Sequence, residues 1–251
     1  MKKYFVSLFF LICAIGSFSQ ISEAEDLKAL FVKANEAYRN QDYEHALTDY
    51  GQLSEQTHAP EIYYNLGNVA FKMKKIGLAI LSYERARKLD PRNSDIVKNL
   101  KQAKELVEYR VEDKRGWYVQ QLSEFLKYFK WKECLIALLL NYFFLLVVWF
   151  VELFSKGKVS FARVKSIVTS VFIILIISAS AKFYQTNITK EGVVVKGKVD
   201  VRYGPSPNDK LAFNLTEGIS FRVEDELDNW YRISLVNGES GWVARDGIEI
   251  I

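Results

Sequence analysis

The sequence LIALLLNYFFLLVVWFV, residues 135–151, is followed after a short basic connector by IVTSVFIILIISASA, residues 167–181. Asn141 is the only polar residue of the first stretch, and the second contains nothing more polar than serine and threonine. A helix of about 20 mostly apolar residues spans a bilayer. Aromatic and lysine side chains at its ends can complete the span, and here these are Trp131, Lys132, Lys182 and Tyr184. The two stretches predict a transmembrane helical hairpin over residues 132–184; the alternative is a hairpin buried in a soluble core.

Two signals predict the sidedness of this hairpin. The connector, residues 155–166, contains four basic residues and no acidic residue, which predicts a cytoplasmic loop because basic loops are retained on that side. Residues 1–19 have the basic, apolar and small-residue parts of a signal peptide. Together they predict a two-pass protein of a bacterial inner membrane, with its N-terminal and C-terminal parts in the periplasm.

The chain from residue 23 to about residue 112 has helical periodicity and repeats itself. A constant offset of 33 residues aligns Ala34-Asn35, Tyr43, Ala46 and Tyr50 with Gly67-Asn68, Ile76, Ala79 and Tyr83. Small residues in such a pattern let two antiparallel helices approach closely, while the tyrosines fill the space between helix pairs. The pattern predicts stacked helix pairs.

The second copy, from Tyr64 to Pro91, resembles a tetratricopeptide repeat at nearly every signature position. The first copy is looser, because Lys33 stands where leucine is usual and the closing proline, Pro60, comes late. A third segment, from Ser94 to about Glu112, has the features of a more polar capping helix. The resemblance implies a short all-α solenoid over residues 20–113, with about two repeats and a cap.

The same resemblance implies a groove for an extended peptide, lined by the first helix of each pair. The positions that would line it are Phe31, Asn35, Tyr38, Arg39, Tyr64, Asn68, Phe71 and Lys72. The alternative is that these aromatic residues pack internally. Phe31 and Asp95 occupy positions where a subset of the family places lysines that bind a terminal carboxylate, so no such clamp is predicted.

Residues 114–131 link the capping helix to the first apolar stretch. Apolar residues recur there at helical spacing, namely Trp117, Tyr118, Leu122, Phe125, Leu126 and Phe129. The spacing predicts an amphipathic juxtamembrane helix that lies at the bilayer surface. Packing of the same stripe against the repeats is the alternative.

After a polar linker, Gln185 to Glu191, the pattern changes to short β-branched runs separated by turn residues. The predicted strands are Val193–Val195, Val199–Val201, Ile219–Val223, Trp230–Leu235 and Gly241–Val243. Asn237-Gly238 predicts a tight hairpin turn in which both residues have positive φ. Residues 191–251 are therefore predicted to form a small all-β domain.

The runs Val199–Ser206, Asn229–Ile233 and Gly241–Val243 resemble a bacterial SH3-like domain. Members of that family often bind cell-wall peptide or serve as assembly modules. Tyr203, Trp230 and Trp242 are the candidate ligand surface. Filling of the core of a domain of ~60 residues is the alternative role of the tryptophans.

Composition and residue types exclude several functions. The net charge is +4 with no long basic run, so no nucleic-acid partner is predicted. Cys13 and Cys134 lie in apolar segments, and the only histidines, His45 and His58, are at surface-type helix positions. We therefore predict no catalytic residue, no metal site and no cofactor, and hence a protein that is not an enzyme.

The whole order of segments resembles the BatE-type proteins of the Bacteroides aerotolerance operon family. That resemblance implies an envelope-stress complex with membrane-anchored von Willebrand A-type proteins as partners. The fold predicted overall is multidomain: an all-α tetratricopeptide-repeat solenoid, a transmembrane α-helical hairpin and a small all-β SH3-like barrel. The predicted function is a membrane scaffold for protein partners, and the alternative is an envelope sensor that binds peptidoglycan.

Overall fold

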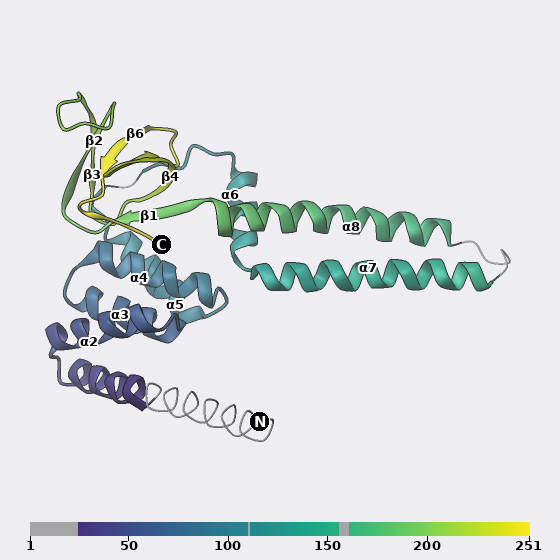
Figure 1. Ribbon diagram of the computed structural model, residues 1–251, viewed down its shortest axis with the longest axis horizontal. Helices are drawn as coiled ribbons and strands as arrows, with labels where there is room; N and C mark the ends of the chain where they lie inside the picture. Colours follow the sequence, from purple (N-terminus) through teal and green to yellow (C-terminus); the bar gives the residue numbers. More distant parts are fainter. Residues whose placement is uncertain (1–24, 110, 156–160) are drawn as a thin grey trace, which may run out of the picture.

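The computed structural model describes residues 25–109, 111–155 and 161–251. It contains a helical repeat region, a pair of long apolar helices and a C-terminal antiparallel β-sheet (Figure 1), so the predicted fold class is confirmed. The signal-peptide prediction and residues 156–160 of the connector lie outside the described residues.

The repeat region stacks five antiparallel helices: residues 25–39, α2 (Tyr43–Gln56), α3 (Pro60–Lys72), α4 (Ile76–Leu89) and α5 (Ser94–Glu105). Hydrogen bonds recur at the predicted period, because Tyr50 donates to Asn35 (2.9 Å) and Tyr83 donates to Asn68 (2.8 Å). The turn inside each pair also recurs, with positive φ at Gln41 (62°) and Lys74 (61°). The 33-residue period is therefore a period of the structure.

The capping helix α5 ends at Glu105, earlier than the predicted end near Glu112. The chain then crosses to the β-sheet, where Val107 and Val111 pack against the apolar core. It continues into α6 (Trp117–Lys127), whose side chains of Tyr118, Leu122 and Phe125 are exposed. Leu126 and Phe129 of the same stripe are half-buried, and Phe129 lines a cavity together with Arg87, Lys88 and Leu89 of α4.

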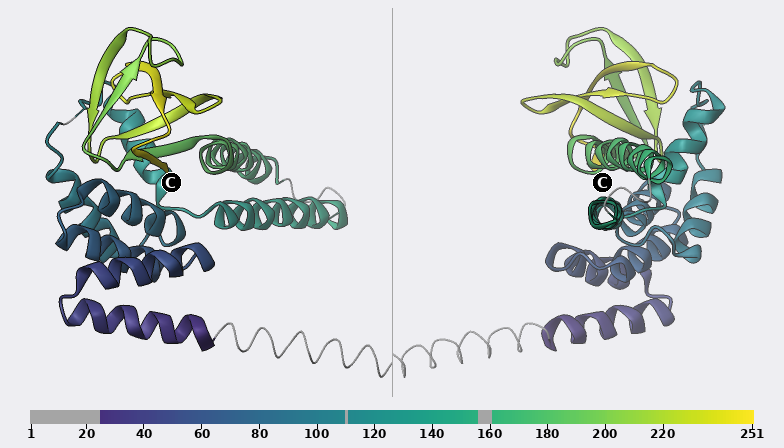
Figure 2. Two further views of the ribbon diagram at one scale, coloured as in Figure 1. Left: turned by 60° about the vertical axis from the view of Figure 1, so that its left-hand side comes forward. Right: turned by 90° about the vertical axis from the view of Figure 1, so that its right-hand side faces the viewer.

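The two apolar helices, α7 (Trp131–Phe154) and α8 (Ala162–Phe183), lie side by side (Figures 1 and 2). Both are long and apolar enough to cross a membrane. Only 6% and 11% of the most apolar 18-residue stretch of each helix is buried. The rings of Trp131 and Phe183 are 5.1 Å apart at one end of the pair. Such helices are compatible with a membrane protein.

The prediction of a polar linker from Gln185 to Glu191 is wrong. Tyr184–Ile188 form a π-helical turn that continues α8. The backbone N–H of Thr189 donates to the carbonyl of Tyr184 (3.0 Å), and β1 begins one residue later. Only Thr189 therefore separates the helical turn from the sheet (Figure 1).

The β-domain is one antiparallel sheet in the order β3-β2-β6-β5-β4-β1-β7. Its strands are β1 (Lys190–Val194), β2 (Lys198–Arg202), β3 (Leu211–Thr216), β4 (Ser220–Leu227), β5 (Trp230–Ser234), β6 (Ser240–Ala244) and β7 (Ile248–Ile250). Strands β3 and β7 were not predicted, because neither is a long β-branched run. The prediction for Asn237-Gly238 is wrong in detail, because only Gly238 has positive φ (92°). The backbone N–H of Leu235 still donates to the carbonyl of Glu239 (2.8 Å), so the loop between β5 and β6 is residues 236–238 and ends in a left-handed glycine.

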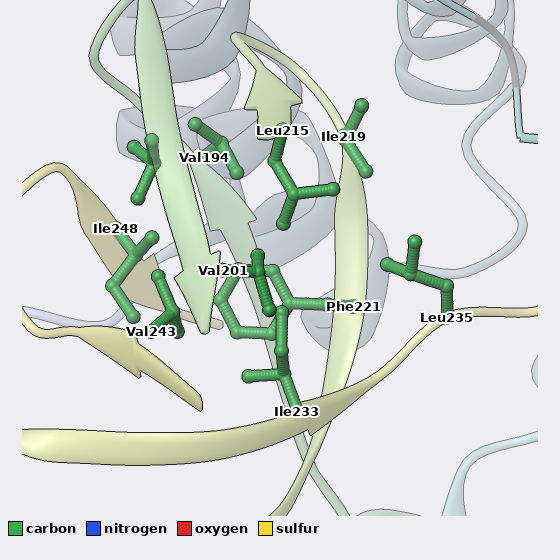
Figure 3. Packing of buried hydrophobic residues seen from close by; sticks show 10 residues of the cluster. Val194, Val201, Leu215, Ile219, Phe221, Ile233, Leu235, Val243 and Ile248 are labelled. Atoms are coloured by element: carbon green, nitrogen blue, oxygen red, sulfur yellow. The ribbon is translucent and has the colours of Figure 1, made fainter. Parts of the chain in front are cut away.

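The core of the β-domain is aliphatic apart from one phenylalanine. Figure 3 shows the packed side chains, which are Val194, Val201, Leu215, Ile219, Phe221, Ile233, Leu235, Val243 and Ile248, together with Val199. Trp230 and Trp242 are half-buried and lie outside this core.

The β-domain packs on the solenoid at Gly77 of α4. The N–H of Gly77 donates to the Glu217 carboxylate (2.7 Å), and a Cβ at residue 77 would collide with the carbonyl oxygen of Val194. Val193 is fully buried in the solenoid core, whereas Val194 is buried in the sheet core. Strand β1 thus joins two cores, and both domains lie at the same end of the hairpin (Figures 1 and 2).

A buried ion-pair network reinforces the same region. The Glu84 carboxylate contacts the Arg87 guanidinium (2.6 Å) and the Lys104 ammonium (2.6 Å). Arg87 in turn lies 3.6 Å from Glu124 of α6. Burial alone would raise the pKa of Glu84, but the charges of Lys104 and Arg87 outweigh it and hold the pKa at about 2.

Gly77→Ala should weaken the junction, because β1 must move away from α4. We expect a loss of ~1–3 kcal/mol in the free energy of unfolding, measured on the full chain in detergent, with faster proteolysis in residues 106–116. Gly51→Ala in α2 is the matched control, since nothing lies within 4 Å of its Cβ, and it should raise stability by ~0.5–1 kcal/mol. Equal stability of the two variants would contradict the junction.

Glu84→Gln should remove an acid-dependent part of the stability. The pKa of Glu84 falls from 4.5 to about 2 on folding, so its contribution is present above pH 4.5 and is lost as pH falls toward 2. A difference of this size corresponds to ~3 kcal/mol. Denaturant titrations of the full chain between pH 2 and 7 should show a flatter acid limb in Glu84→Gln than in the exposed control Glu61→Gln. An unchanged acid limb is the contrary result.

Candidate functional site

A cavity of about 280 Å³ opens on the face formed by the first helix of each pair. Its walls come from the helix over residues 25–39, α3, α4 and α5. The residues that line it are Tyr38, Tyr64, Asn68, Phe71, Lys72, Tyr83, Asn99 and Gln102. We call this the solenoid cavity.

Asn68 is the polar centre of the solenoid cavity. Its side-chain oxygen accepts hydrogen bonds from the hydroxyl of Tyr83 (2.8 Å) and the amide of Asn99 (3.0 Å). Asn99 also donates to the hydroxyl of Tyr64 (3.2 Å). Both acceptor directions of the Asn68 oxygen are therefore occupied. Within the described part of the chain its amide nitrogen has no partner, so it can donate to a bound carbonyl group.

The hydroxyl of Tyr83 stays protonated at any physiological pH. Burial raises the pKa of Tyr83, and the nearby Tyr64 adds to the effect. The hydroxyl therefore remains a donor and holds the Asn68 carboxamide in one orientation. Lys72, exposed at the rim, adds a positive charge. This arrangement places a fixed N–H donor beside a positive charge.

The structure brings five of the eight predicted groove residues together, namely Tyr38, Tyr64, Asn68, Phe71 and Lys72. Phe31, Asn35 and Arg39 do not line the cavity. The ring of Phe31 packs edge-on against Tyr50 at 6.2 Å. Asn35 accepts from Tyr50 and donates to the Phe31 carbonyl (2.8 Å), so its oxygen and its amide nitrogen are both engaged inside the fold.

Three lining residues, Tyr83, Asn99 and Gln102, were not predicted. A signal for Gln102 was present in the sequence. The 34-residue step that relates Asn65-Leu66 to Asn99-Leu100 also relates Asn68 to Gln102. Extending the repeat pattern into the capping helix would have placed Gln102 in the groove, whereas Asn99 aligns with Asn65, which is not a groove position.

The three residues predicted as the SH3-like surface lie on the outside of the sheet. Trp242 is paired with Arg202 on one neighbouring strand and with Arg232 on the other. Residues paired across antiparallel strands share a face, so the Trp242 side chain is on the same face of the sheet as those of Arg202 and Arg232. Trp230 alternates with the inward Ile233 and Tyr231, and Tyr203 is 69% exposed after β2. The ligand-surface role of these three residues stays a prediction.

Other side chains that could carry chemistry are the possible metal ligands and the two histidines, His45 and His58. Among the described residues, no group of three histidine, cysteine or acidic side chains can hold a metal ion. His45 contacts Asp42 (2.7 Å) at the exposed start of α2, and His58 contacts the hydroxyl of Tyr63 (2.8 Å). Each histidine has a structural partner.

Comparison with known families gives two local matches. The family model for the tetratricopeptide repeat matches residues 60–93, and that for the bacterial SH3 domain matches residues 195–248. No curated protein matches this chain. The chain thus contains a tetratricopeptide repeat that forms one wall of the solenoid cavity, and a bacterial SH3 domain that packs on it. Both kinds of domain are typically non-catalytic and act in binding, the first to proteins and the second also to peptidoglycan.

Proposed function

We propose that this protein is a non-enzymatic scaffold of a bacterial inner membrane. It presents the solenoid cavity to a peptide segment of a protein partner, and it holds the SH3-like domain beside that cavity. The observation that carries the proposal is that Tyr83 and Asn99 fix the Asn68 carboxamide, whose amide nitrogen has no partner among the residues that the structure describes. A preorganised donor of this kind lowers the cost of binding.

Two features support this location, namely the two apolar helices and the junction. If α7 and α8 both cross the bilayer, the chain returns to the side on which it started. The contact of Gly77 with Glu217 and Val194 requires the same, because it joins a part before the hairpin to a part after it. With the signal-peptide pattern of residues 1–19, both domains belong in the periplasm.

The order of segments also supports a BatE-type role. In that role the partners are membrane-anchored von Willebrand A-type proteins, and the process is tolerance of envelope stress. A scaffold with two binding domains on one rigid base suits an assembly of several membrane proteins.

A second candidate is an envelope sensor that binds peptidoglycan. It is favoured by the match to the bacterial SH3 domain and by the aromatic residues outside its core, with Tyr203 exposed and Trp242 paired with Arg202 and Arg232. In this case the ligand would contact the sheet, and the solenoid cavity would not be needed.

Asn68→Ala combined with Lys72→Gln should reduce capture of the protein partner at least tenfold. The change removes a positioned donor and a rim cation, each worth ~1 kcal/mol or more in a binding site. The measurement is crosslinking of the full chain in whole cells, followed by quantification of the captured proteins. Asn40→Ala with Lys28→Gln is the matched control, since both residues are exposed and neither lines the cavity.

Unchanged capture of the protein partner by the Asn68 and Lys72 variant would show that the solenoid cavity does not bind that partner. Pelleting of the detergent-solubilised full chain with purified wall material, run in parallel, separates the two candidates. Pelleting that Trp242→Ala abolishes and the groove variant preserves would favour the sensor.

Reporter fusions test the sidedness directly. Fusions after Arg110, Ser160 and Ile251 should report periplasm, cytoplasm and periplasm, because the hairpin enters and leaves the membrane on one side. The readout is alkaline phosphatase activity against a cytoplasmic fluorescent reporter. A periplasmic signal at Ser160 would overturn the topology.

A further inference from the structure

A second cavity, of about 580 Å³, lies where the apolar helices meet the folded domains. Its walls come from the end of α4, the turn between α6 and α7, the end of α8 and the π-helical turn. Six basic side chains line it: Arg87, Lys88, Lys127, Lys130, Lys132 and Lys182. We call this the basic cavity.

The positive charge of the basic cavity is only partly balanced by the acidic residues around it. Only two acidic residues, Glu84 and Glu191, line it, and Glu84 is already engaged by Arg87 and Lys104. Lys127 pairs with Glu124 (2.9 Å). Over the described ranges of the chain, the ammonium groups of Lys130, Lys132 and Lys182 form no ion pair. An anion in the cavity would relieve their mutual repulsion.

The position of the cavity identifies the kind of anion. Trp131 begins α7 and lines the cavity, and its ring packs on Phe183 near the end of α8 (5.1 Å). Aromatic residues at span ends lie at the headgroup level of a bilayer. The exposed apolar side chains of α7 begin directly beyond, at Leu135 and Ile136. A bound headgroup could thus leave its acyl chains along the hairpin.

One further polar group points to a hydroxyl-bearing headgroup. The side-chain oxygen of Gln185 is buried and has no hydrogen-bond partner, and Gln185 lines the basic cavity. A glycerol hydroxyl can donate to such an oxygen, whereas a bare phosphate diester cannot. A zwitterionic headgroup would add a cation to an already basic site.

We propose that the basic cavity binds the headgroup of an anionic glycerophospholipid, with phosphatidylglycerol as the fitting chemistry. Lys130, Lys132 and Lys182 hold the phosphate, and Gln185 accepts from the glycerol group. The inference rests on the part of the proposed function that places the hairpin in a bilayer. It uses neither the solenoid cavity nor the sheet surface.

The test is native mass spectrometry of the detergent-solubilised full chain with phosphatidylglycerol or phosphatidylcholine at equal concentrations. We expect selective retention of phosphatidylglycerol. The triple variant Lys130→Gln, Lys132→Gln, Lys182→Gln should weaken this binding about 100-fold, because each ammonium group near an anionic headgroup contributes about fivefold. The triple variant with arginine at these positions should keep the preference, which separates loss of charge from loss of fold.

The matched control is Lys28→Gln, Lys98→Gln, Lys101→Gln, which removes the same charge from exposed positions of the solenoid. It should bind phosphatidylglycerol as the wild type does. Equal retention of the two lipids, or unchanged binding by the first triple variant, would overturn the proposal. Tighter binding of glycerol 3-phosphate or of a glutamate-rich peptide than of phosphatidylglycerol would overturn it too, in favour of a soluble phosphate or an acidic partner.

Carbonate extraction of cell membranes separates this inference from the proposed function. A chain that stays in the membrane but shows no lipid preference refutes the basic-cavity proposal alone. A chain that carbonate releases refutes the membrane placement and this proposal together.

Discussion

The contact of β1 with α4 at Gly77 is the constraint on which the arrangement of this protein depends. It joins residues that precede the hairpin to residues that follow it, and it buries Val193 in one core and Val194 in the other. Arg85 adds a hydrogen bond to the carbonyl of Ile250 (2.7 Å). The solenoid and the β-domain therefore form one folded body. The hairpin projects from this body, because the chain leaves it in α7 and returns to it in α8.

This body also determines how α6 is placed. Ser123 and Lys127, on one side of α6, line cavities shared with the folded domains, while Tyr118, Leu122 and Phe125 on the other side are exposed. The helix lies across the axis of the hairpin (Figure 1). A helix with this orientation, an apolar outer stripe and a polar inner side suits a membrane surface. The folded body would then rest on the bilayer through α6.

Patterns that recur within a few residues could be predicted from the sequence, and long-range contacts could not. The 33-residue offset identified the helix pairs, and the apolar stretches identified α7 and α8, because periodicity and apolar length are local properties. The groove was only partly predicted: Tyr38 and Asn68 follow from the repeat, but Tyr83 belongs to the second helix of a pair. Gly77 gave no signal, since its role appears only when β1 packs on it. The paired arginines beside Trp242 likewise depend on strand order, which β-strand patterns do not specify.

The basic residues at the two ends of the hairpin have different physical explanations. The connector contains Lys156, Lys158, Arg163 and Lys165 in a short loop, as expected of a loop retained in the cytoplasm. The opposite end is also basic, with six cations around one cavity, two of them from α4. The predicted orientation rests on the connector and on the signal-peptide pattern of residues 1–19 together. The cations that line the basic cavity have a different explanation, which is the binding of a lipid headgroup beside Trp131. In that view the body rests on the bilayer through a lipid that it selects, and the junction at Gly77 places that lipid close to the domains that bind the partners.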